Sequence, residues 1–546
     1  MKNKNKILSI VTLSIFGAML CACNFESKTS DNSLFVRKTS GFNSIFYVGE
    51  PISYDGIKVV DSNNEEVSDY TFSIEEGTIL GYESDKLTIE VSKPGYEKAS
   101  FNVTVLREGY PYEGTIDIYS INDFHGAFSY SQDDEQTGFS RIATYLLNKK
   151  EENPFTVIVS AGDMWQGGIE SNKTKGKIVN ETMNIATFDA MTLGNHEFDW
   201  GEEVIKENAS LAEFPYLGSN LTYSSNDKRP SYLKGSTIVN KGEVKIGIIG
   251  SLASDLGSDI TASISKNFHF NDPNDYIIEE SNKLKEEGCD LIFLVAHDSG
   301  FYDYGTDKDF KFDYITSGDY VDGIFLGHDH FKKSGSFNEV PYLEGGKNGN
   351  YISHMSFSFT LDKDKNFSLG NSRSYETILT QGIEFNTPNT LVDNLTTKYK
   401  EVIGDVNRVI CSFNEYKSKD ALLNIACKAI ISYINNHKDL YGIEVTVGVH
   451  NTGGVRDSAQ RGDFTYSDLI RVFPFSNTLV LFNVTQYEYY EVIDSNYSVI
   501  KDAPTFTNGV ATIGTINYVA EYYGTNFTDT GILIQDVIEE YLSENY

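Results

Sequence analysis

Five short segments of the sequence carry side chains that bind hard divalent metal ions. They are Asn122-Asp123-Phe124-His125, Gly162-Asp163, Gly194-Asn195-His196-Glu197-Phe198-Asp199, His297 and Gly327-His328-Asp329-His330. Imidazole, carboxylate and amide ligands suit zinc, manganese or iron, and no thiolate is present to select a soft structural site. One carboxylate shared by two cations can hold them roughly 3.5–4 Å apart. We therefore predict a site for two metal ions, bridged by Asp163 because it stands alone after its strand.

Each segment follows a run of residues typical of a β-strand. The runs are 115–121, 157–160, 191–193, 291–296 and 323–326. In the first, Ile116 and Ile118 alternate with Asp117 and Tyr119. Because side chains at the carboxyl ends of adjacent strands converge on one crevice in an open α/β sheet, we expect the five segments to meet there.

A single His or Asp after a strand is usually a cap or a satisfied polar group. Five of the nine histidines, however, fall in these segments, and clustered ligands favour a metal site over isolated structural roles. The other histidines match no ligand position, and we interpret them as structural: His269, His354, His437 and His450.

In this order, the segments resemble the calcineurin-like metallophosphoesterases, and among them the exported bacterial 5′-nucleotidases. The resemblance implies an α/β fold class: a four-layer β-sandwich flanked by helices, with a mixed α/β C-terminal domain. It implies divalent cofactors, which could be Zn, Mn, Co or Fe. The implied ligands are Asp123, His125, Asp163 and His330 for one ion, and Asp163, Asn195, His297 and His328 for the other. His196 matches the family's catalytic histidine, and Asp199 matches its orienting partner.

Two later segments resemble the substrate-binding domain of the same family. They are Val449-His450-Asn451-Thr452-Gly453-Gly454-Val455-Arg456 and Arg471-Val472-Phe473-Pro474-Phe475-Ser476-Asn477. The resemblance implies substrate contacts from Asn451, Gly453 and Arg456, and stacking of a base on Phe475. Tyr518 falls where the family has a second stacking aromatic. Without the metal ligands upstream, the same residues would be interpreted as a turn, an ion pair and core aromatics.

The chain departs from the family pattern at two places around the nucleoside. The family usually has Arg near residues 417–419, where this chain has Lys417 and Lys419. It also has Gly-Gly-Asp-Gly after the second aromatic, where this chain reads Glu521-Tyr522-Tyr523-Gly524-Thr525-Asn526. The sequence therefore predicts the reaction more firmly than the substrate.

The first residues resemble an export signal. Lys2, Lys4 and Lys6 precede an apolar run over 7–20, which is too short to span a bilayer. Leu20-Cys21-Ala22-Cys23 resembles a bacterial lipobox, which implies cleavage before Cys23 and its lipidation. The alternative is an ordinary secretory leader. We expect an exported protein, lipid-anchored at the extracellular face of the cell membrane.

The remaining chain divides by pattern. Short β-type runs up to about residue 110 resemble the immunoglobulin-like modules of bacterial surface proteins. Beyond residue 114 strands alternate with helices, which we predict over 141–149, 176–185, 273–287 and 390–403, with a polar, irregular stretch over 362–390. The expected divisions are a signal peptide (1–23), an immunoglobulin-like β domain (24–110), a metallophosphoesterase domain (114–362), a linker with a helix (363–404) and a C-terminal substrate-binding domain (405–546).

The net charge of the chain excludes one class of function. The charge of −33 argues against non-specific nucleic-acid binding, which needs a basic surface.

Few cysteines are available for disulfides. After the leader, Cys289, Cys411 and Cys427 remain. They allow at most one disulfide, between Cys411 and Cys427, and buried free thiols are the favoured alternative.

We predict a cell-surface phosphohydrolase that releases phosphate from nucleoside 5′-monophosphates, and from di- and triphosphates, through a metal-bound hydroxide. One alternative is a 2′,3′-cyclic nucleotide phosphodiesterase or a nucleotide-sugar pyrophosphatase that uses the same metals. Another is a non-catalytic surface-binding protein with a decayed site, although the complete ligand set argues against decay. The oligomeric state stays open.

Overall fold

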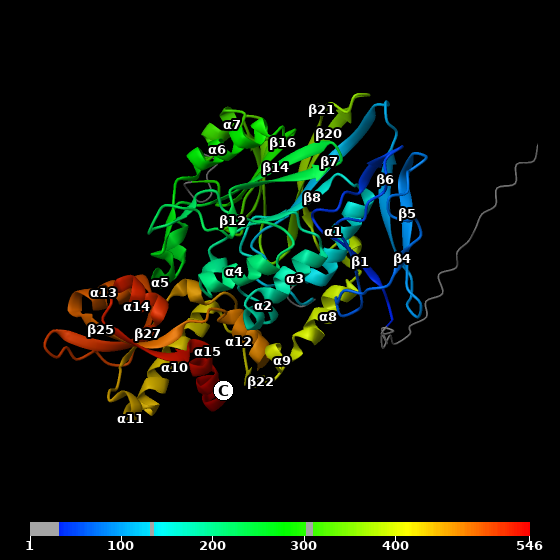
Figure 1. Cartoon of the computed structure of the whole chain (residues 1–546). Helices are drawn as coiled ribbons and strands as arrows, with labels where there is room; N and C mark the ends of the chain where they lie inside the picture. Colours follow the sequence, from blue (N-terminus) through cyan, green and yellow to red (C-terminus); the bar gives the residue numbers. More distant parts are fainter. Residues whose placement is uncertain (1–31, 132–135, 302–309) are drawn as a thin grey trace, which may run out of the picture.

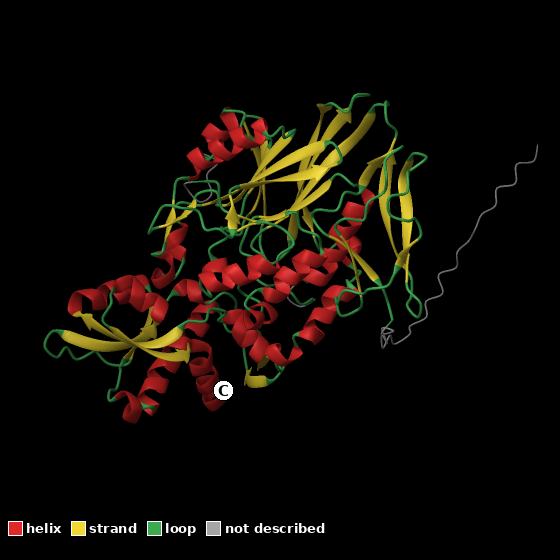
Figure 2. Ribbon diagram, viewed as in Figure 1, coloured by secondary structure: helices red, strands yellow, loops and turns green. Residues whose placement is uncertain are grey.

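The structure is a computed structural model that describes residues 32–131, 136–301 and 310–546. The predicted leader and Cys23 lie outside these residues. Three parts follow one another along the chain: a small β part in blue, a central part in cyan to green, and a C-terminal α/β part in orange to red (Figure 1). The predicted mixed α/β architecture, with a small β part at the N-terminal end, is confirmed (Figure 2).

The first sheet of the central part has seven strands, and five of them are parallel. In spatial order they are β12 (Leu233–Lys234), β10 (Tyr216–Leu217), β9 (Ala190–Thr192), β8 (Thr156–Ser160), β7 (Tyr112–Ile121), β20 (Tyr351–Leu361) and β21 (Phe367–Leu379). Three of the predicted metal-binding segments follow β7, β8 and β9. They therefore lie at one edge of this sheet.

A second sheet of six strands carries the other two segments. In spatial order its strands are β13 (Ser236–Lys241), β14 (Val244–Leu252), β16 (Leu291–His297), β17 (Gly323–Phe325), β19 (Val340–Gly345) and β18 (Lys332–Phe337). The two sheets pack through a buried apolar layer in which Ile118 and Val157 of the first join Ile248 and Phe293 of the second. The open sheet assumed for the convergence of the five segments is wrong, because the crevice lies where two stacked sheets end together. The sandwich implied by the family resemblance is confirmed.

Helices cover the outer faces of both sheets. Those on the first sheet are α1 (Phe139–Glu152), α2 (Ile169–Thr174), α3 (Lys177–Ile185) and α4 (Glu202–Leu211), and those on the second are α6 (Pro273–Glu286) and α7 (Asp313–Ser317). In α1, Phe139, Ile142 and Leu146 are spaced three or four residues apart and are fully buried against the sheet. The helices predicted over 141–149, 176–185 and 273–287 correspond to α1, α3 and α6, and all three are confirmed.

Of two predictions around the end of the central part, the irregular stretch is wrong and the linking helix is confirmed with one break. Residues 362–390 are not irregular throughout, because β21 pairs with β20 along most of its length and extends the first sheet. This edge strand is polar and mostly exposed, so it lacks the apolar alternation of a half-buried strand. The helix expected over 390–403 is two helices, α8 (Thr390–Lys398) and α9 (Lys400–Ile403), separated at Tyr399.

The N-terminal part packs firmly on the central part. Its strands are β1 (Phe35–Lys38), β2 (Ile45–Tyr47), β3 (Ile57–Val60), β4 (Thr71–Phe72), β5 (Ser84–Ser92) and β6 (Ala99–Leu106). Val60 is fully buried in the core under α1 and α3, while Ile45 joins the layer between the two large sheets. The guanidinium of Arg37, 7% exposed, lies 2.7 Å from the carboxylate of Glu213. Membership of an immunoglobulin-like family stays a prediction.

The C-terminal part is built on a five-stranded sheet. Its strands are, in spatial order, β26 (Tyr497–Ile500), β23 (Val447–His450), β27 (Val510–Ile516), β25 (Thr478–Thr485) and β28 (Phe527–Leu533). The helices α10 (Lys419–Asn436), α12 (Tyr466–Val472), α13 (Gln486–Ser495), α14 (Asn517–Tyr523) and α15 (Ile534–Asn545) pack around it. Cys289, Cys411 and Cys427 are free thiols. No helix within the described ranges has both the length and the apolar character needed to cross a membrane.

Candidate active site

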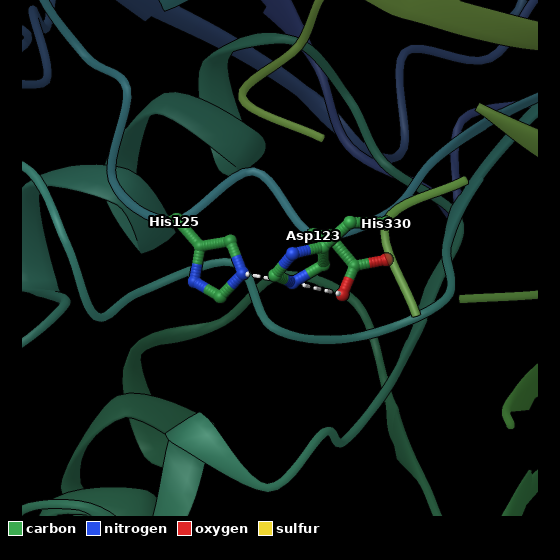
Figure 3. A group of neighbouring side chains, drawn as sticks. All are labelled: Asp123, His125 and His330. Atoms are coloured by element: carbon green, nitrogen blue, oxygen red, sulfur yellow. Dashed lines mark hydrogen bonds and ion pairs between the residues drawn. The ribbon is translucent and has the colours of Figure 1, made fainter. Parts of the chain in front are cut away.

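The predicted ligands of the first ion meet at the edge of the first sheet. Asp123 and His125 follow β7, His330 follows β17, and their metal-binding atoms lie within 4.8 Å of one another. Nε2 of His330 lies 2.9 Å from Nε2 of His125 and 3.5 Å from Oδ1 of Asp123 (Figure 3). Three ligand atoms that converge in this way favour a bound cation over a single proton shared between two of them.

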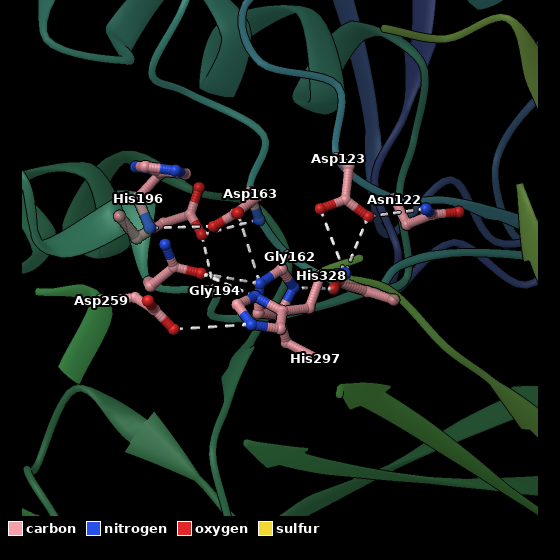
Figure 4. Close-up of polar contacts among 12 residues, drawn as sticks. Asn122, Asp123, Gly162, Asp163, Gly194, His196, Asp259, His297 and His328 are labelled. Atoms are coloured by element: carbon pink, nitrogen blue, oxygen red, sulfur yellow. Dashed lines mark hydrogen bonds and ion pairs between the residues drawn. The ribbon is translucent and has the colours of Figure 1, made fainter. Parts of the chain in front are cut away.

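The predicted ligands of the second ion adjoin this group. Nε2 of His297 lies 3.3 Å from Oδ2 of Asp163 and 3.1 Å from Oδ1 of Asn195. Nδ1 of His328 lies 3.1 Å from the same Asn195 oxygen. In Figure 4, Asp163, His297 and His328 point toward one another. Asp163 also groups with His125, so the structure brings all seven predicted ligands into one centre.

Backbone carbonyls fix the orientation of two of the imidazole rings. Nδ1 of His125 lies 3.0 Å from the carbonyl oxygen of Gln166, and Nδ1 of His297 lies 2.7 Å from that of Ala161. A carbonyl oxygen only accepts, so Nδ1 carries the proton in each ring when the ring is neutral. The lone pair of Nε2 then faces the centre, as metal ligation requires.

The centre concentrates backbone strain. Positive φ angles occur at Asp123 (47°), His125 (49°), Asp163 (53°), His328 (88°) and His330 (66°). Residues other than glycine adopt this conformation at a cost of order 1–3 kcal/mol each, and such strain clusters at functional sites. Gly194 allows a close approach of two loops, because a Cβ there would lie 2.2 Å from Oδ1 of Asp163.

Burial and neighbouring charges shift the pKa values of the centre. Burial alone would raise the pKa of Asp163, but His297 and His196 outweigh it and hold that pKa well below its usual range. Burial, followed by the positive charge of His297, lowers the pKa of His328 to about 4. Burial and Arg456 lower the pKa of His330 to about 3. Ionised Asp163 beside neutral His328 and His330 gives the protonation states in which these side chains bind metals.

His196 is held by two carboxylates. Its Nδ1 lies 2.9 Å from Oδ2 of Asp199, and its backbone N donates to Oδ1 of Asp163 at 2.8 Å. Burial alone would lower the pKa of His196, but Asp199 and Asp163 outweigh it and raise this pKa. The Asp199 contact leaves Nε2 of His196 as the nitrogen available to a bound phosphate.

Glu197 organises the centre without being a predicted ligand. Its fully buried carboxylate accepts hydrogen bonds from the backbone N–H groups of Asp163 (2.9 Å), Met164 (2.8 Å), Trp165 (3.3 Å) and Gly194 (2.6 Å). These bonds tie the loop after β8 to the loop after β9. Glu197 lies inside the predicted metal-binding segment 194–199, yet only the fold reveals which groups its carboxylate binds.

One cavity of about 320 Å³ joins the metal-binding centre to the C-terminal part. All five predicted substrate residues line it: Asn451, Gly453, Arg456, Phe475 and Tyr518. His196, Asp199 and Asp163 line it as well. The guanidinium carbon of Arg456 lies 5.8 Å from the centroid of the Phe475 ring, close enough for a cation–π contact.

The cavity is also lined by residues that were not predicted as site residues. Asp259, at the end of the short helix η2 (Leu256–Asp259), places Oδ2 3.5 Å from Nε2 of His328. Asn477 and Asn517 contribute amides to the lining. Asp259 lies in a polar loop outside every recognised segment, so no sequence pattern marks it. The four histidines that were interpreted as structural form their hydrogen bonds outside this centre. For example, Nε2 of His354 lies 3.0 Å from Oδ1 of Asp117.

Two protein-family models match the chain. The calcineurin-like phosphoesterase model matches residues 116–332, and the model of the 5′-nucleotidase C-terminal domain matches residues 402–529. An apyrase of Tabanus yao is 28% identical over 415 residues, which cover 68% of this chain and 72% of the apyrase. The 5′-nucleotidase of Mus musculus is 26% identical over 403 residues, which cover 67% of this chain and 69% of that enzyme.

The fold also matches solved structures. A 5′-nucleotidase precursor from Thermus thermophilus superposes with a TM-score of 0.63 at 18% identity, covering 79% of this chain and 96% of the other. The matched regions contain every predicted metal ligand and all the predicted substrate residues. The chain belongs to the calcineurin-like phosphoesterases with a 5′-nucleotidase C-terminal domain, and it is a metal-dependent phosphoester hydrolase.

Proposed function

We propose that this hydrolase removes phosphate from nucleoside 5′-monophosphates, with di- and triphosphates as further substrates. One observation supports this most: a single cavity is lined both by residues of the metal-binding centre and by the aromatic side chains of Phe475 and Tyr518. A nucleotide has matching ends, since its phosphate is an oxyanion and its base has two π-faces. The names of the curated relatives agree with this substrate class.

The donor set fits two divalent ions, with Asp163 between them. Asp123, His125, Asp163 and His330 would hold one ion, and Asp163, Asn195, His297 and His328 the other. The converging Nε2 atoms of His125 and His330 are the observation that favours a cation. When bound, the ions supply Lewis-acid polarisation of the phosphoryl oxygens and a water nucleophile at neutral pH.

The residues of the chain position the phosphate and stabilise its charge. Asp199 accepts from Nδ1–H of His196, so Nε2 of His196 donates to the phosphoryl or leaving-group oxygen. Arg456 adds a positive charge at the junction between phosphate and nucleoside. Asn451 supplies an amide for the sugar, and Phe475 and Tyr518 provide the faces for the base.

We also propose that the protein is exported and anchored through Cys23. The lipobox-like Leu20-Cys21-Ala22-Cys23 supports this assignment. Cys23→Ala should move the protein from the membrane fraction to the soluble fraction of cells. If the variant stays with membranes after a high-salt wash, the lipid anchor is wrong.

A substrate panel tests the proposed reaction. Phosphate release would be measured from nucleoside mono-, di- and triphosphates, 2′,3′-cyclic nucleotides and nucleotide sugars, with Mn²⁺, Zn²⁺, Co²⁺ and Mg²⁺ tested separately. We expect 5′-monophosphates to have the highest kcat/KM. A higher kcat/KM for cyclic nucleotides or nucleotide sugars would make those compounds the preferred substrates and contradict the proposal. Bound metal without turnover on any of them would contradict catalysis.

A further inference from the structure

A second cavity, of about 220 Å³, lies at the boundary between the central and C-terminal parts. It adjoins the cavity of about 320 Å³ lined by Phe475 and Tyr518, here called the nucleoside cavity. It shares Arg456 with the nucleoside cavity and is also lined by His125. Gln166, Lys347 and Asn348 complete its wall next to the metal-binding centre. The proposed reaction gives no role to Gln166, Lys347 or the cavity itself.

Two cations, Lys347 and Arg456, line this cavity, and the surrounding carboxylates act on them from beyond ion-pair distance. Within the described ranges, neither Lys347 nor Arg456 has a carboxylate oxygen within ion-pair distance. The acidic residues of the lining have partners: Asp457 pairs with Arg471, and the carboxylate of Glu170 accepts from the hydroxyl of Ser129. In a chain with a net charge of −33, two unpaired cations at one cavity indicate an anionic ligand.

Gln166 points to the same conclusion independently. Its side chain is 1% exposed, and neither Nε2 nor Oε1 has a hydrogen-bond partner among the described residues. A buried polar group without a partner costs about 1–3 kcal/mol, so such groups are normally satisfied by a ligand or by water. An oxyanion in the cavity would accept from the Gln166 amide.

The backbone holds Lys347 in place. The N–H of Asn348 donates to the carbonyl of Asp123 at 2.8 Å, and the N–H of Asn350 donates to the carbonyl of Lys347 at 3.0 Å. The turn that carries Lys347 is therefore tied to a predicted metal ligand. Burial lowers the pKa of Lys347, and the positive charges of Arg456 and Lys419 lower it further, because both disfavour the charged form of the lysine. A bound anion would stabilise that charged form.

We propose that this second cavity binds one tetrahedral oxyanion, held by Lys347, Arg456 and the side-chain amide of Gln166. The proposal rests on the proposed function only for the origin of the anion, which is either released orthophosphate or an additional phosphate group of the substrate. Because the second cavity lies next to His125 and Arg456, it forms a second phosphate subsite beside the one at the metal-binding centre.

Calorimetric titration of the metal-loaded, full-length protein with inorganic phosphate tests the proposal without turnover. We expect two phosphate sites per chain in the wild type. Lys347→Gln should weaken one of them at least tenfold, and Lys332→Gln, an exposed control on β18, should leave both intact. Gln166→Leu should weaken the same site while the melting temperature stays equal or rises, because it removes an unsatisfied polar group.

Kinetics identify the source of the anion. If Lys347→Gln raises the inhibition constant of inorganic phosphate and leaves the KM of nucleotides unchanged, the ligand is released phosphate. If it raises the KM of a triphosphate more than that of a monophosphate, the ligand is part of the substrate.

One phosphate site in the wild type, or Lys347→Gln behaving like Lys332→Gln in every measurement, would overturn the second subsite. Failure of the proposed function would appear separately, as phosphate binding without nucleotide hydrolysis.

Discussion

The ring of Phe475, from the C-terminal part, lies against the ring of His196, from the central part, with centroids 5.5 Å apart and planes inclined at 36°. An aromatic residue assigned to the base and a histidine assigned to the phosphate thus touch across the boundary between two parts of the chain. The substrate site is therefore complete only when both parts are in place.

The first prediction concerns catalysis by His196. His196→Asn should retain bound metal and slow kcat by roughly 10²–10⁴, the usual size of a proton-transfer or charge-stabilising contribution. Asp163→Asn should lose metal and activity together, because it removes the bridging carboxylate. Metal analysis and steady-state kinetics on both variants would check this. Equal metal loss in the two variants would make His196 a ligand.

The second prediction concerns Glu197, which joins two ligand loops through four backbone N–H groups. In Glu197→Gln, an amide N–H₂ replaces one accepting oxygen and faces those donors. Metal affinity should fall roughly 10–100-fold, the usual effect of losing a group that supports the ligands. Glu203→Gln, with a side chain 87% exposed on α4, is the matched control. Unchanged metal affinity in Glu197→Gln would contradict a supporting role for the Glu197 carboxylate.

The third prediction concerns pH and stability. Burial lowers the pKa of His450 from 6.5 to about 4, so below pH 6.5 the unfolded chain takes up a proton that the folded chain does not. The free energy of unfolding therefore contains a contribution from neutral His450 that is complete above pH 6.5. This contribution is lost as the pH falls toward 4, at about 1.4 kcal/mol per pH unit.

Melting curves at pH 7 and pH 5 would check the effect. His450→Asn should lose less stability between these values than the wild type, whereas His269→Asn, with a side chain 52% exposed, should follow the wild type. A steeper loss in His450→Asn than in the wild type would contradict the direction.

Much of the site could be predicted because its signals are local. The ligands stand directly after short apolar strands, so the spacing of residue types within each segment reveals them. The nucleoside side could be predicted from Phe475, Arg456 and Tyr518 only through resemblance, since each could equally be a core or surface residue. The structure brings all three to one cavity.

Other features depend on contacts that no local pattern encodes. The two stacked sheets arise because β16 pairs with β14 and β17 pairs with β16, whereas neither pairs with β8. The strands of both sheets are apolar, so composition does not reveal which strands pair. The polar edge strand β21 belongs to its sheet through backbone pairing. Asp259 and Lys347 reach their cavities only through the folding of distant loops.

The fourth prediction concerns motion between the parts. Asn172 donates to the carbonyl of Pro474 at 2.9 Å, and Nζ of Lys173 donates to the hydroxyl of Tyr466 at 2.7 Å, so the parts are in contact beside the centre. With Phe475 against His196, a nucleotide needs this boundary to open before it can enter.

A reducible crosslink between Lys173→Cys and Tyr466→Cys should reduce turnover at least tenfold, and reduction should restore it. Each single cysteine variant, treated with the same reagent, is the control. Full activity in the crosslinked protein would rule out an obligatory opening.

The most direct measurement of the central claim is the selectivity of Phe475→Ala between a nucleoside 5′-monophosphate and a small aryl phosphate. If the base stacks on Phe475, the contact contributes on the order of 1–3 kcal/mol. The KM for the nucleotide should then rise roughly tenfold or more, since about 1.4 kcal/mol is a factor of ten, while hydrolysis of the aryl phosphate stays nearly unchanged. Tyr518→Ala should shift selectivity in the same direction. Equal loss of both activities in Phe475→Ala would contradict a shared nucleotide site.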